Sequence, residues 1–538
     1  MNEYDYIIVG AGSAGSVLAN RLSENEKNSV LVLEAGGSDC SFWVQLPIGY
    51  GKTFHDERFN WKYTTEPDPG LNGNRIYWPR GKVMGGSSSI NAMVYVRGHP
   101  LDYDDWAKVA PGWGWSDVAP IFRKVEDWAG GADGVRGEGG PLHVHDISNE
   151  VHGLTRTYLT AAKQAGIRFN LDYNGEYMEG ASLYQITTRN GRRESTSRSY
   201  LRPALRRRNL DLQLEAHVTR VLFEGRQASG VEFTQGGEKK TAKAKREVIL
   251  CGGAINSPQL LQLSGVGPES LLRNLGIPVV QASPEVGRNL MDHLGFGHHY
   301  KANVPTLNQD LNSVLGKLRA GLQYLLRRSG PLSLSLNQGG GFVRIDTNAD
   351  RPDTQLYFSP CSFTSAPVGT RPVMTLDPFK GFMIGFNPCK PTSAGHLRIR
   401  SADPFETPEM HANYLATEYD CRIMLAGSKL LRKIARSPAL DAAIELEIPV
   451  ATSAMQDDEL LSFIRENAST VFHQCGTCRM GTDASANVVD ARLRVHGVHG
   501  LRVADASVFP TIPTGNINAP AIMVGEKAAE ITLEDAHS

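Results

Sequence analysis

The stretches YDYIIVGAGSAG at residues 4–15 and SVLVLEAGG at residues 29–37 decide the fold. Each contains an apolar run that is typical of a buried strand, and the sequence between them is helical, so together they form a βαβ unit. Gly10, Gly12 and Gly15 give the pattern G-x-G-x-x-G where the first strand passes into the helix. We therefore expect a parallel sheet with a ligand-binding turn at its carboxyl edge.

The residue types of this turn suit a dinucleotide. The first glycine allows a tight turn, the second lets the backbone approach a pyrophosphate, and the third lets the helix pack closely on the strand. The phosphates then lie at the amino end of the helix. Glu34 closes the second strand, where it accepts hydrogen bonds from ribose hydroxyls. The pattern predicts dinucleotide binding without separating NAD from FAD.

Two further strand-turn-helix units lie far along the chain. REVILCGG at residues 246–253 precedes a helical stretch, in which we expect Ser257 to be the N-cap and Pro258 the first helical residue. LRVADASVF at residues 501–509 precedes a helix at the carboxyl end. Three such units indicate one nucleotide-binding domain assembled from distant segments.

The region between these units has a different pattern. Residues 301–464 contain a helical stretch at 311–328, apolar runs such as GFMIGFNP at 381–388, and a second helical stretch at 422–435. This pattern predicts an antiparallel sheet with helices on one side. We expect an α/β fold with an α+β substrate domain. The FAD or NAD domain would comprise 1–155, 193–300 and 465–538, and the substrate domain 156–192 and 301–464.

Composition limits the class of protein. The 538 residues are 41% hydrophobic and 21% charged, which is typical of a globular enzyme. The formal net charge is -1, so the chain has no overall positive charge that would attract nucleic acid. The start lacks an export signal, and the seven cysteines are odd in number and scattered, so we expect a cytoplasmic protein with free thiols and no metal site. No apolar stretch is long enough to span a membrane, which leaves peripheral membrane contact and the oligomeric state open.

One segment distinguishes the two cofactors. WPRGKVMGGSSSINAMVYVRG at residues 78–98 is rich in small residues, as needed where backbone approaches a flat, polar flavin ring. This segment resembles a signature of the glucose-methanol-choline (GMC) oxidoreductases. Further resemblances follow in order: GGAINSPQLLQLSGVGP at 252–268, VGRNLMDHLG at 286–295, HQCGTCRMG at 473–481 and VADASVFPTIPTGNINAP at 503–520. The motifs are most similar to those of the bacterial alcohol and choline dehydrogenase-like branch.

The resemblance implies FAD as the cofactor and assigns its site residue by residue. Some members of the family carry a histidine at the position of Ile90 and attach FAD to it, so isoleucine implies non-covalent binding. Val218 is expected to meet the adenine, Asp505 and Ala506 the ribityl and phosphate region, and Asn518 the pyrimidine end of the ring. The other cofactor-binding residues expected are Gly10, Gly12, Ser13, Ala14, Gly15, Glu34, Ala35, Arg80, Gly81, Val83, Gly85, Gly86, Ser87, Asn91, Ala92, Met93, Val94, Gly252, Asn516 and Ile517.

The resemblance also implies the catalytic pair His473 and Asn516. Hydride transfer from an alcohol leaves a carbonyl, so a base must take the hydroxyl proton, and an imidazole with a pKa near 6.5 can do so at neutral pH. Asn516 occupies the position of the second catalytic residue, where it would hydrogen-bond the alcohol oxygen without acting as a base. We expect oxidation of an alcohol to an aldehyde or ketone. Cys475 and Cys478 form C-x-x-C, but the context does not favour a redox dithiol.

The motifs leave the electron acceptor, the reaction class and the alcohol open. Electrons from the flavin would pass to a quinone, another carrier or oxygen, and no motif separates a dehydrogenase from an oxidase. The same motifs would also suit a hydroxynitrile lyase with non-redox FAD, or a flavoprotein that only binds its cofactor. The alcohol is undefined, since no excess of acidic residues near the motifs indicates choline. An apolar substrate cavity would be lined by aromatic residues such as Trp61, Trp78, Tyr357, Phe358 and Phe363.

Overall fold

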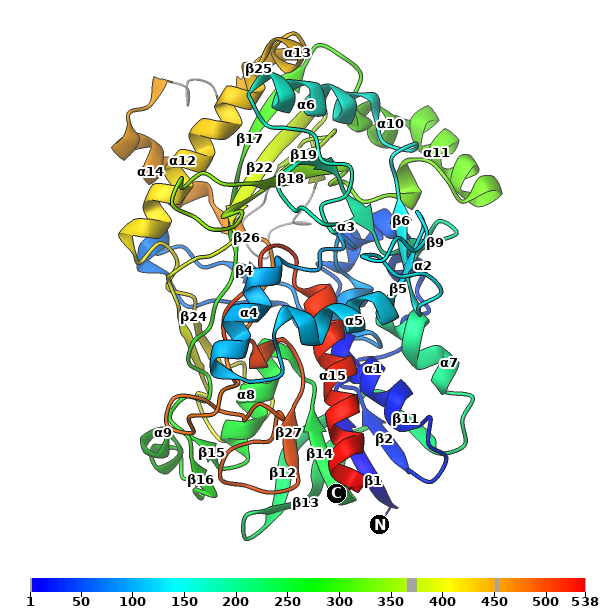
Figure 1. The fold of residues 1–538 in the computed structure, drawn as a ribbon, viewed down its shortest axis with the longest axis vertical. Helices are drawn as coiled ribbons and strands as arrows, with labels where there is room; N and C mark the ends of the chain where they lie inside the picture. The colour runs from blue at the N-terminus through cyan, green and yellow to red at the C-terminus, as the bar shows by residue number, and fades with distance from the viewer. Residues whose placement is uncertain (1, 365–374, 450–453, 538) are drawn as a thin grey trace.

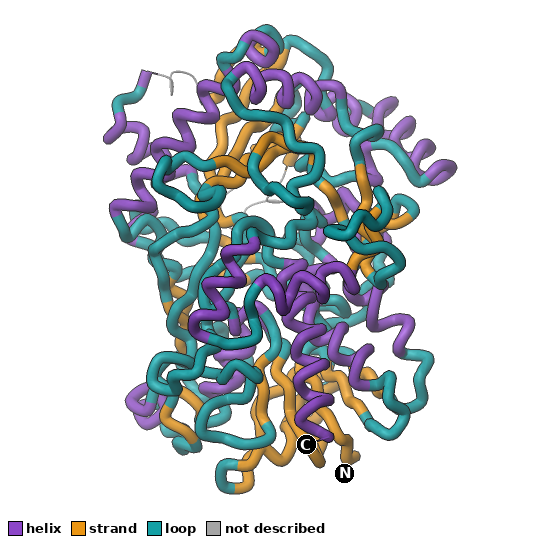
Figure 2. Tube along the Cα trace, in the orientation of Figure 1, coloured by secondary structure: helices purple, strands orange, loops and turns teal. Residues whose placement is uncertain are grey.

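A computed structural model describes residues 2–364, 375–449 and 454–537, and most of its longer strands belong to two seven-stranded sheets, with smaller sheets, loops and helices around them (Figures 1 and 2). The first sheet has seven strands in the order β11-β2-β1-β14-β13-β12, with β27 beside β14. Its strands are β1 (Asn2–Val9), β2 (Val30–Leu33), β11 (Leu210–Gln213), β12 (Ala216–Glu224), β13 (Gln227–Gln235), β14 (Glu238–Leu250) and β27 (Leu501–Val503). Strands from both ends of the chain thus share one sheet.

The pairing within this sheet confirms the expected α/β class. β1 is parallel to β2 and β14, and β14 is parallel to β27, whereas β12 and β13 form an antiparallel extension. The side chains of Ile7, Ile8 and Val32 are fully buried, each worth roughly 1.5–3 kcal/mol relative to exposure. The helices α1 (Ser13–Leu22) and α15 (Asn518–His537) pack against each other, and the two chain ends lie together in Figure 1.

The second sheet is antiparallel, as the sequence predicts. Its order is β25-β17-β22-β19-β18-β7, with β26 beside β17. The helices α6 (Gly153–Gln164) and α12 (Glu418–Ala435) pack on it. Its strands are β7 (Gly180–Leu183), β17 (Leu294–Ala302), β18 (Gly339–Val343), β19 (Thr354–Ser359), β22 (Gly381–Pro388), β25 (Ile444–Ile448) and β26 (Ser469–Thr470).

The remaining helices, together with two short 3-10 helices, surround the two sheets (Figure 1). These elements are α2 (Phe42–Gln45), η1 (Pro47–Gly49), α3 (Tyr50–Thr53), α4 (Pro100–Val109), α5 (Trp115–Val125), α6 (Gly153–Gln164), α7 (Arg202–Ala204), α8 (Gly253–Leu263), α9 (Glu269–Asn274), α10 (Leu307–Asn312), α11 (Val314–Arg327), η5 (Pro331–Ser333), α12 (Glu418–Ala435), α13 (Pro438–Asp441) and α14 (Asp457–Asn467). The helix expected at 422–435 is α12. The stretch at 311–328 is divided at Ser313, whose hydroxyl caps α11 by accepting from the Gly316 N–H at 3.0 Å.

The predicted start of α8 is wrong. The helix begins at Gly253 with Gly252 as its N-cap, so Ser257 and Pro258 lie inside it. Ser257 instead donates its hydroxyl to Asp505 at 2.6 Å. A proline in this position cannot donate to the Ala254 carbonyl, and the hydroxyl of Thr477 donates to that carbonyl at 2.7 Å. The side chain of a distant segment therefore replaces the missing helical hydrogen bond.

Gly10 and Gly15 have the tight-turn and close-packing geometry that the pattern predicts. Gly10 has a φ of 102°, and a Cβ there would lie 2.6 Å from the Cys251 carbonyl oxygen. A Cβ on Gly15 would lie 2.0 Å from the Gly10 carbonyl oxygen, so only glycine lets α1 approach the strand. Around Gly12 there is open space toward the cavity, because a Cβ there would meet no atom closer than 3.9 Å.

Candidate active site

A cavity of about 790 Å³ extends from the β1–α1 turn to the second sheet. Most cofactor-binding residues expected from the sequence line it, as do His473 and Asn516. The lining members of that set are Gly10, Gly12, Ser13, Ala14, Glu34, Ala35, Arg80, Gly81, Gly86, Ser87, Asn91, Ala92, Met93, Val94, Val218, Gly252, Asp505, Ala506, Asn516, Ile517 and Asn518. The chain thus brings residues 10–35, 80–94 and 505–518 to one surface.

Three expected residues do not line the cavity. Gly15 lies at the contact between α1 and β1, as described above. Val83 is fully buried and forms a bridge with Gly37. Gly85 has a φ of 88° and donates its N–H to the Ala11 carbonyl at 2.8 Å, so it supports the lining from behind. Among the aromatic residues expected at the substrate, Trp61, Tyr357 and Phe363 line the cavity, whereas Trp78 and Phe358 are fully buried elsewhere.

Glu34 lines the cavity at the end of β2. Its carboxylate accepts the Ala11 N–H at 2.8 Å and the Gly36 N–H at 2.9 Å. Burial raises the pKa of Glu34 to about 7, although the two N–H donors oppose this shift. These bonds orient a carboxylate at the end of β2, where a ribose can donate its hydroxyls to the oxygens.

The middle of the cavity has backbone on both sides and suits a pyrophosphate. A Cβ on Gly86 would lie 2.7 Å from the Cα of Gly12, so the two loops touch. The amino end of α15 also reaches the cavity, and Asn518 there accepts the Ser13 hydroxyl at 2.7 Å. Two helix amino ends, those of α1 and α15, thus direct partial positive charge into the same space. The residues present therefore fit FAD.

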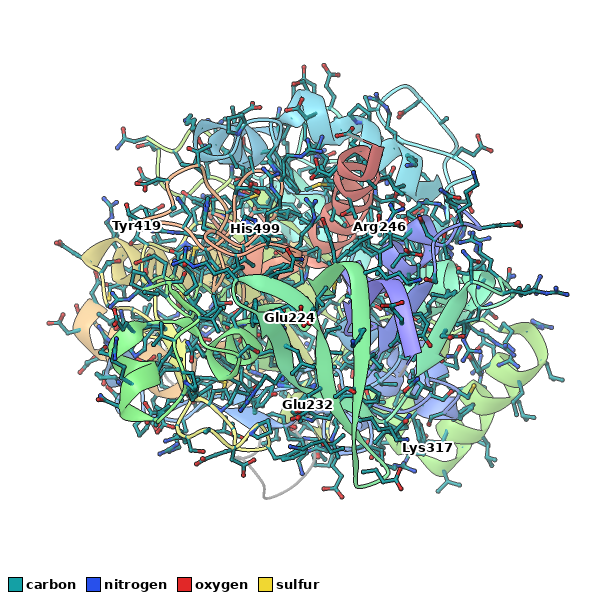
Figure 3. The ribbon with its side chains drawn as sticks, turned by 90° about the horizontal axis from the view of Figure 1, so that it is seen from below. Glu224, Glu232, Arg246, Lys317, Tyr419 and His499 are labelled. Atoms are coloured by element: carbon teal, nitrogen blue, oxygen red, sulfur yellow. The ribbon has the colours of Figure 1, made fainter. Side chains whose placement is uncertain are left out.

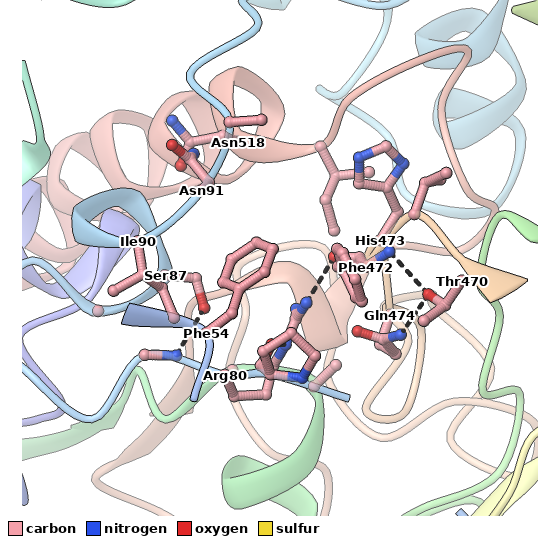
Figure 4. Close-up of a pocket in the computed structure, with 18 of the residues that line it drawn as sticks. Phe54, Arg80, Ser87, Ile90, Asn91, Thr470, Phe472, His473, Gln474 and Asn518 are labelled. Carbon is pink, nitrogen blue, oxygen red and sulfur yellow. Dashed lines mark hydrogen bonds between the residues drawn. The ribbon is translucent and has the colours of Figure 1, made fainter. Parts of the chain in front are cut away.

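His473 lines the same cavity and follows β26 of the second sheet, three residues after Thr470 (Figure 4). Its side chain is only 6% exposed. Its Nε2 is 3.0 Å from the Asn516 Nδ2, and its Nδ1 is 2.9 Å from the Nδ1 of His293. The remaining ring nitrogen of His293, Nε2, is 2.9 Å from the Cys389 carbonyl oxygen.

This arrangement defines which nitrogen of His473 carries the proton. A carbonyl only accepts, so His293 donates through Nε2 and, when neutral, has a lone pair on Nδ1. His473 must then donate through Nδ1, which leaves the lone pair on its Nε2. The Asn516 amide donates to that lone pair, and its oxygen accepts from Gln355 at 3.0 Å. The chain of hydrogen bonds therefore presents a basic nitrogen to the cavity.

Burial keeps both imidazoles neutral. It lowers the pKa of His293 to about 4, and it lowers the pKa of His473 well below 6.5, with further lowering from His293 and the Arg80 guanidinium. Arg80 donates to the Phe472 carbonyl at 2.7 Å, beside the histidine in Figure 4. The value near 6.5 expected for His473 is therefore too high, because that value is for a solvated imidazole.

Asp292 fixes the backbone around the two histidines. It accepts the N–H groups of His473 at 2.7 Å and His293 at 2.9 Å, together with the side chains of Tyr414, Thr470 and Gln474. The motif at 286–295 contains Asp292 and His293 but does not indicate a role for the histidine, since only the fold places it against His473. The sequence gives no signal for Gln355 for the same reason.

Two other sequence features have structural explanations. Cys475 and Cys478 are buried thiols without a disulfide, and burial raises the pKa of each well above 9. Within the described residues, no group of three or more histidine, cysteine or acidic side chains is placed to hold a metal. No helix in the described part of the chain is both long and apolar enough to cross a membrane.

Comparison with known proteins identifies relatives along the whole chain. Models of the GMC oxidoreductase amino- and carboxyl-terminal regions match residues 4–295 and 391–525. An oxygen-dependent choline dehydrogenase of Brucella suis is 41% identical over 99% of this chain and 96% of its own. An alcohol dehydrogenase [acceptor] of Pseudomonas putida is 40% identical over 98% and 96%. A formate oxidase of Aspergillus oryzae, studied for its FAD modification, superposes with a TM-score of 0.91 at 27% identity, covering 100% and 99%.

Proposed function

The chain belongs to the GMC oxidoreductases, and from this premise we propose that it oxidises an alcohol to an aldehyde or ketone with FAD, using His473 as the base. The observation that carries the proposal is the hydrogen-bond chain from Cys389 through His293 to His473, which presents an unprotonated Nε2 to the cavity. When bound, FAD supplies the acceptor for the hydride that leaves the carbinol carbon.

The two polar side chains at the cavity end act on the alcohol oxygen. An oxygen placed between them would accept from the Asn516 amide and donate its proton to the His473 Nε2, replacing the 3.0 Å contact between these two groups. Asn516 then orients the hydroxyl, and His473 removes its proton as the carbonyl forms. Gln355 holds the amide oxygen, which keeps the donating nitrogen on the substrate side.

FAD is held without a covalent bond in this proposal. Ile90 lines the cavity where a nucleophilic side chain would be required for attachment. The binding residues are those expected from the sequence that line the cavity, with Gly15, Val83 and Gly85 supporting them. The proposed cofactor domain, 1–155, 193–300 and 465–538, contains every strand of the first sheet, while β17 crosses from it into the substrate domain, 156–192 and 301–464.

An uncharged, apolar alcohol suits the substrate side of the cavity best. Phe296 lies there in edge contact with Phe386 and Phe463, and Met383 and Ile448 also line the cavity. The acidic side chains that line the cavity among the described residues are Glu34, Asp377 and Asp505. Glu34 and Asp505 accept backbone N–H groups around the cofactor end, and the Asp377 carboxylate accepts the Thr364 hydroxyl, so each of these acids already has a partner other than a quaternary ammonium.

The electron acceptor is proposed to be a quinone or another carrier rather than oxygen. The Pseudomonas putida relative, at 40% identity, is named an alcohol dehydrogenase [acceptor], which supports a carrier. The Brucella suis relative, at 41% identity, is named an oxygen-dependent choline dehydrogenase, so oxygen is the alternative acceptor that the test must separate. The seven free cysteines support a reducing, cytoplasmic setting. In that setting any contact of the protein with a membrane would be a peripheral association at the membrane surface.

The test is anaerobic mixing of the purified flavoprotein with alcohols of graded polarity. A substrate should bleach the flavin band near about 450 nm, and reoxidation should be faster with a quinone than with oxygen. Product formation without bleaching would favour a lyase and contradict the proposal.

A further inference from the structure

One helix of this protein exposes an apolar face. Six side chains of α11 are 57% to 80% exposed: Val314, Leu315, Leu318, Leu322, Leu325 and Leu326. At 3.6 residues per turn they occupy roughly a third of the helix circumference. The side chains of Ala320 and Tyr324, on the opposite side, are buried against the protein. The apolar face of this amphipathic helix is therefore turned outward.

Positive charge accompanies this face. Lys317, Arg319 and Arg327 are exposed on α11, and Arg328 follows at its end. Residues 314–328 contain no acidic side chain. Figure 1 shows α11 projecting from the molecule away from both sheets, and Figure 3 shows Lys317 at the periphery. A surface that complements α11 is therefore apolar within and anionic at its boundary.

A second exposed apolar group is connected to α11. Phe42 and Trp43, on α2, are 54% and 42% exposed. The helix α2 contacts η1, η1 contacts η5, and η5 contacts α11, so these elements form one continuous side of the molecule. Aromatic side chains of this kind favour the boundary between lipid headgroups and acyl chains.

This side of the molecule adjoins the wall of the cavity. Asn308, on α10 immediately before α11, donates to the carbonyls of Ser362 at 2.8 Å and Asp377 at 3.0 Å. Asp377 and the neighbouring Phe363 line the cavity, as does Tyr50 of α3. A ligand dissolved in a bilayer under α11 would thus be close to the cavity.

We propose that α11 docks this protein on an anionic lipid surface, with its leucines among the acyl chains and its basic residues at the headgroups. The combination of an outward apolar face with basic residues and no acid is that of an interfacial helix. The consequence for catalysis, that an apolar alcohol or quinone approaches from the bilayer, rests on the proposed function. The docking itself does not.

The test is flotation of the FAD-loaded protein with phosphatidylcholine vesicles that contain or lack phosphatidylglycerol. The wild type should float with the anionic vesicles and less with the neutral ones. Leu318→Glu/Leu322→Glu should lower vesicle binding at least about 10-fold, because two charges enter the apolar face. Lys317→Gln/Arg319→Gln should lower it roughly 5-fold per residue on anionic vesicles only. The matched control is Leu171→Glu, since Leu171 is 85% exposed outside this surface and should bind like the wild type.

Three results would overturn the inference. One is a wild type that fails to float with either vesicle, and another is an equal loss of binding in Leu171→Glu. The third is a wild-type dimer in sedimentation velocity that Leu318→Glu/Leu322→Glu converts to monomer, since a second copy would then cover the face. Flavin bleaching by alcohol with a water-soluble acceptor should be unchanged in all variants. Failure of bleaching in the wild type would contradict the proposed function and leave the vesicle result intact.

Discussion

His293 and His473 share a hydrogen bond between their Nδ1 atoms, 2.9 Å long, and the Cys389 carbonyl at the other side of His293 gives that bond its direction. The imidazole that faces the cavity is therefore held in the tautomer with a free Nε2. Each partner in this chain has a distinct effect on catalysis when it is removed.

Loss of the base should be the most severe change. His473→Ala should slow flavin reduction by on the order of 10²- to 10⁴-fold, because no group remains to take the hydroxyl proton. Asn516→Ala keeps the base and loses the orienting amide, so a loss of roughly 10- to 10²-fold with weaker substrate binding is expected. Rapid-mixing absorbance over a range of alcohol concentrations measures the rate of flavin reduction and the substrate affinity of both variants. FAD content serves as the control and should match the wild type, and equal losses in the two variants would contradict the assignment.

His293→Leu should act through the histidine beside it. The variant removes the acceptor for the His473 Nδ1–H, so both tautomers of His473 become accessible and flavin reduction falls by roughly 10-fold. Removing His293 also removes one of the causes that lower the pKa of His473, so the acid limb of the rate profile should move to higher pH. A His293→Leu enzyme with an unmoved acid limb would show that His293 has only a packing role.

The pH dependence of the wild type follows from the same burial. The folded-state pKa of His473 lies well below 6.5, so the neutral, basic form is present at pH 6–7 and above and is lost only as the pH falls through that lower value. Flavin reduction should therefore be nearly constant from about pH 6.5 upward and decline in acid. A rate that still rises steeply between about pH 6.5 and 8 would mean that another group takes the proton.

Glu34→Gln should weaken FAD binding. Both carboxylate oxygens accept backbone N–H groups, and glutamine would turn an NH₂ group toward the N–H of Ala11 or Gly36. We expect the Kd for FAD to rise on the order of 10-fold, measured by flavin fluorescence on titrating the apoprotein. Lys82→Gln is the control, because Lys82 acts on the Glu34 carboxylate only through its charge. This substitution leaves both hydrogen bonds of Glu34 in place.

Denaturation of the protein should release the FAD as the unmodified, free cofactor. Ile90 offers no atom for covalent attachment, so acid precipitation should release yellow FAD into the supernatant. Mass spectrometry of the precipitate provides the check. A peptide carrying flavin mass would contradict non-covalent binding.

Local patterns are sufficient for the cofactor half of the molecule, because Gly10, Gly12 and Glu34 act within one βαβ unit whose spacing is visible in the sequence. The roles of His293 and Gln355 are not visible there, since their contacts with His473 and Asn516 depend on how distant segments meet. Ser257 resembles a helix cap, yet its hydroxyl is bonded to Asp505, 248 positions away. The amphipathic pattern of α11 indicates a helix, but periodicity does not tell which face the rest of the protein covers.

Asp292 joins Tyr414, Thr470 and the backbone of His473 through one buried carboxylate. Burial raises the pKa of this group, and hydrogen bonds from these separate segments oppose the shift. If any one of these segments moves away, the buried Asp292 carboxylate loses one of its hydrogen bonds. Heat inactivation and loss of tertiary structure should accordingly be a single event, so that a partly unfolded form of this protein retains no turnover.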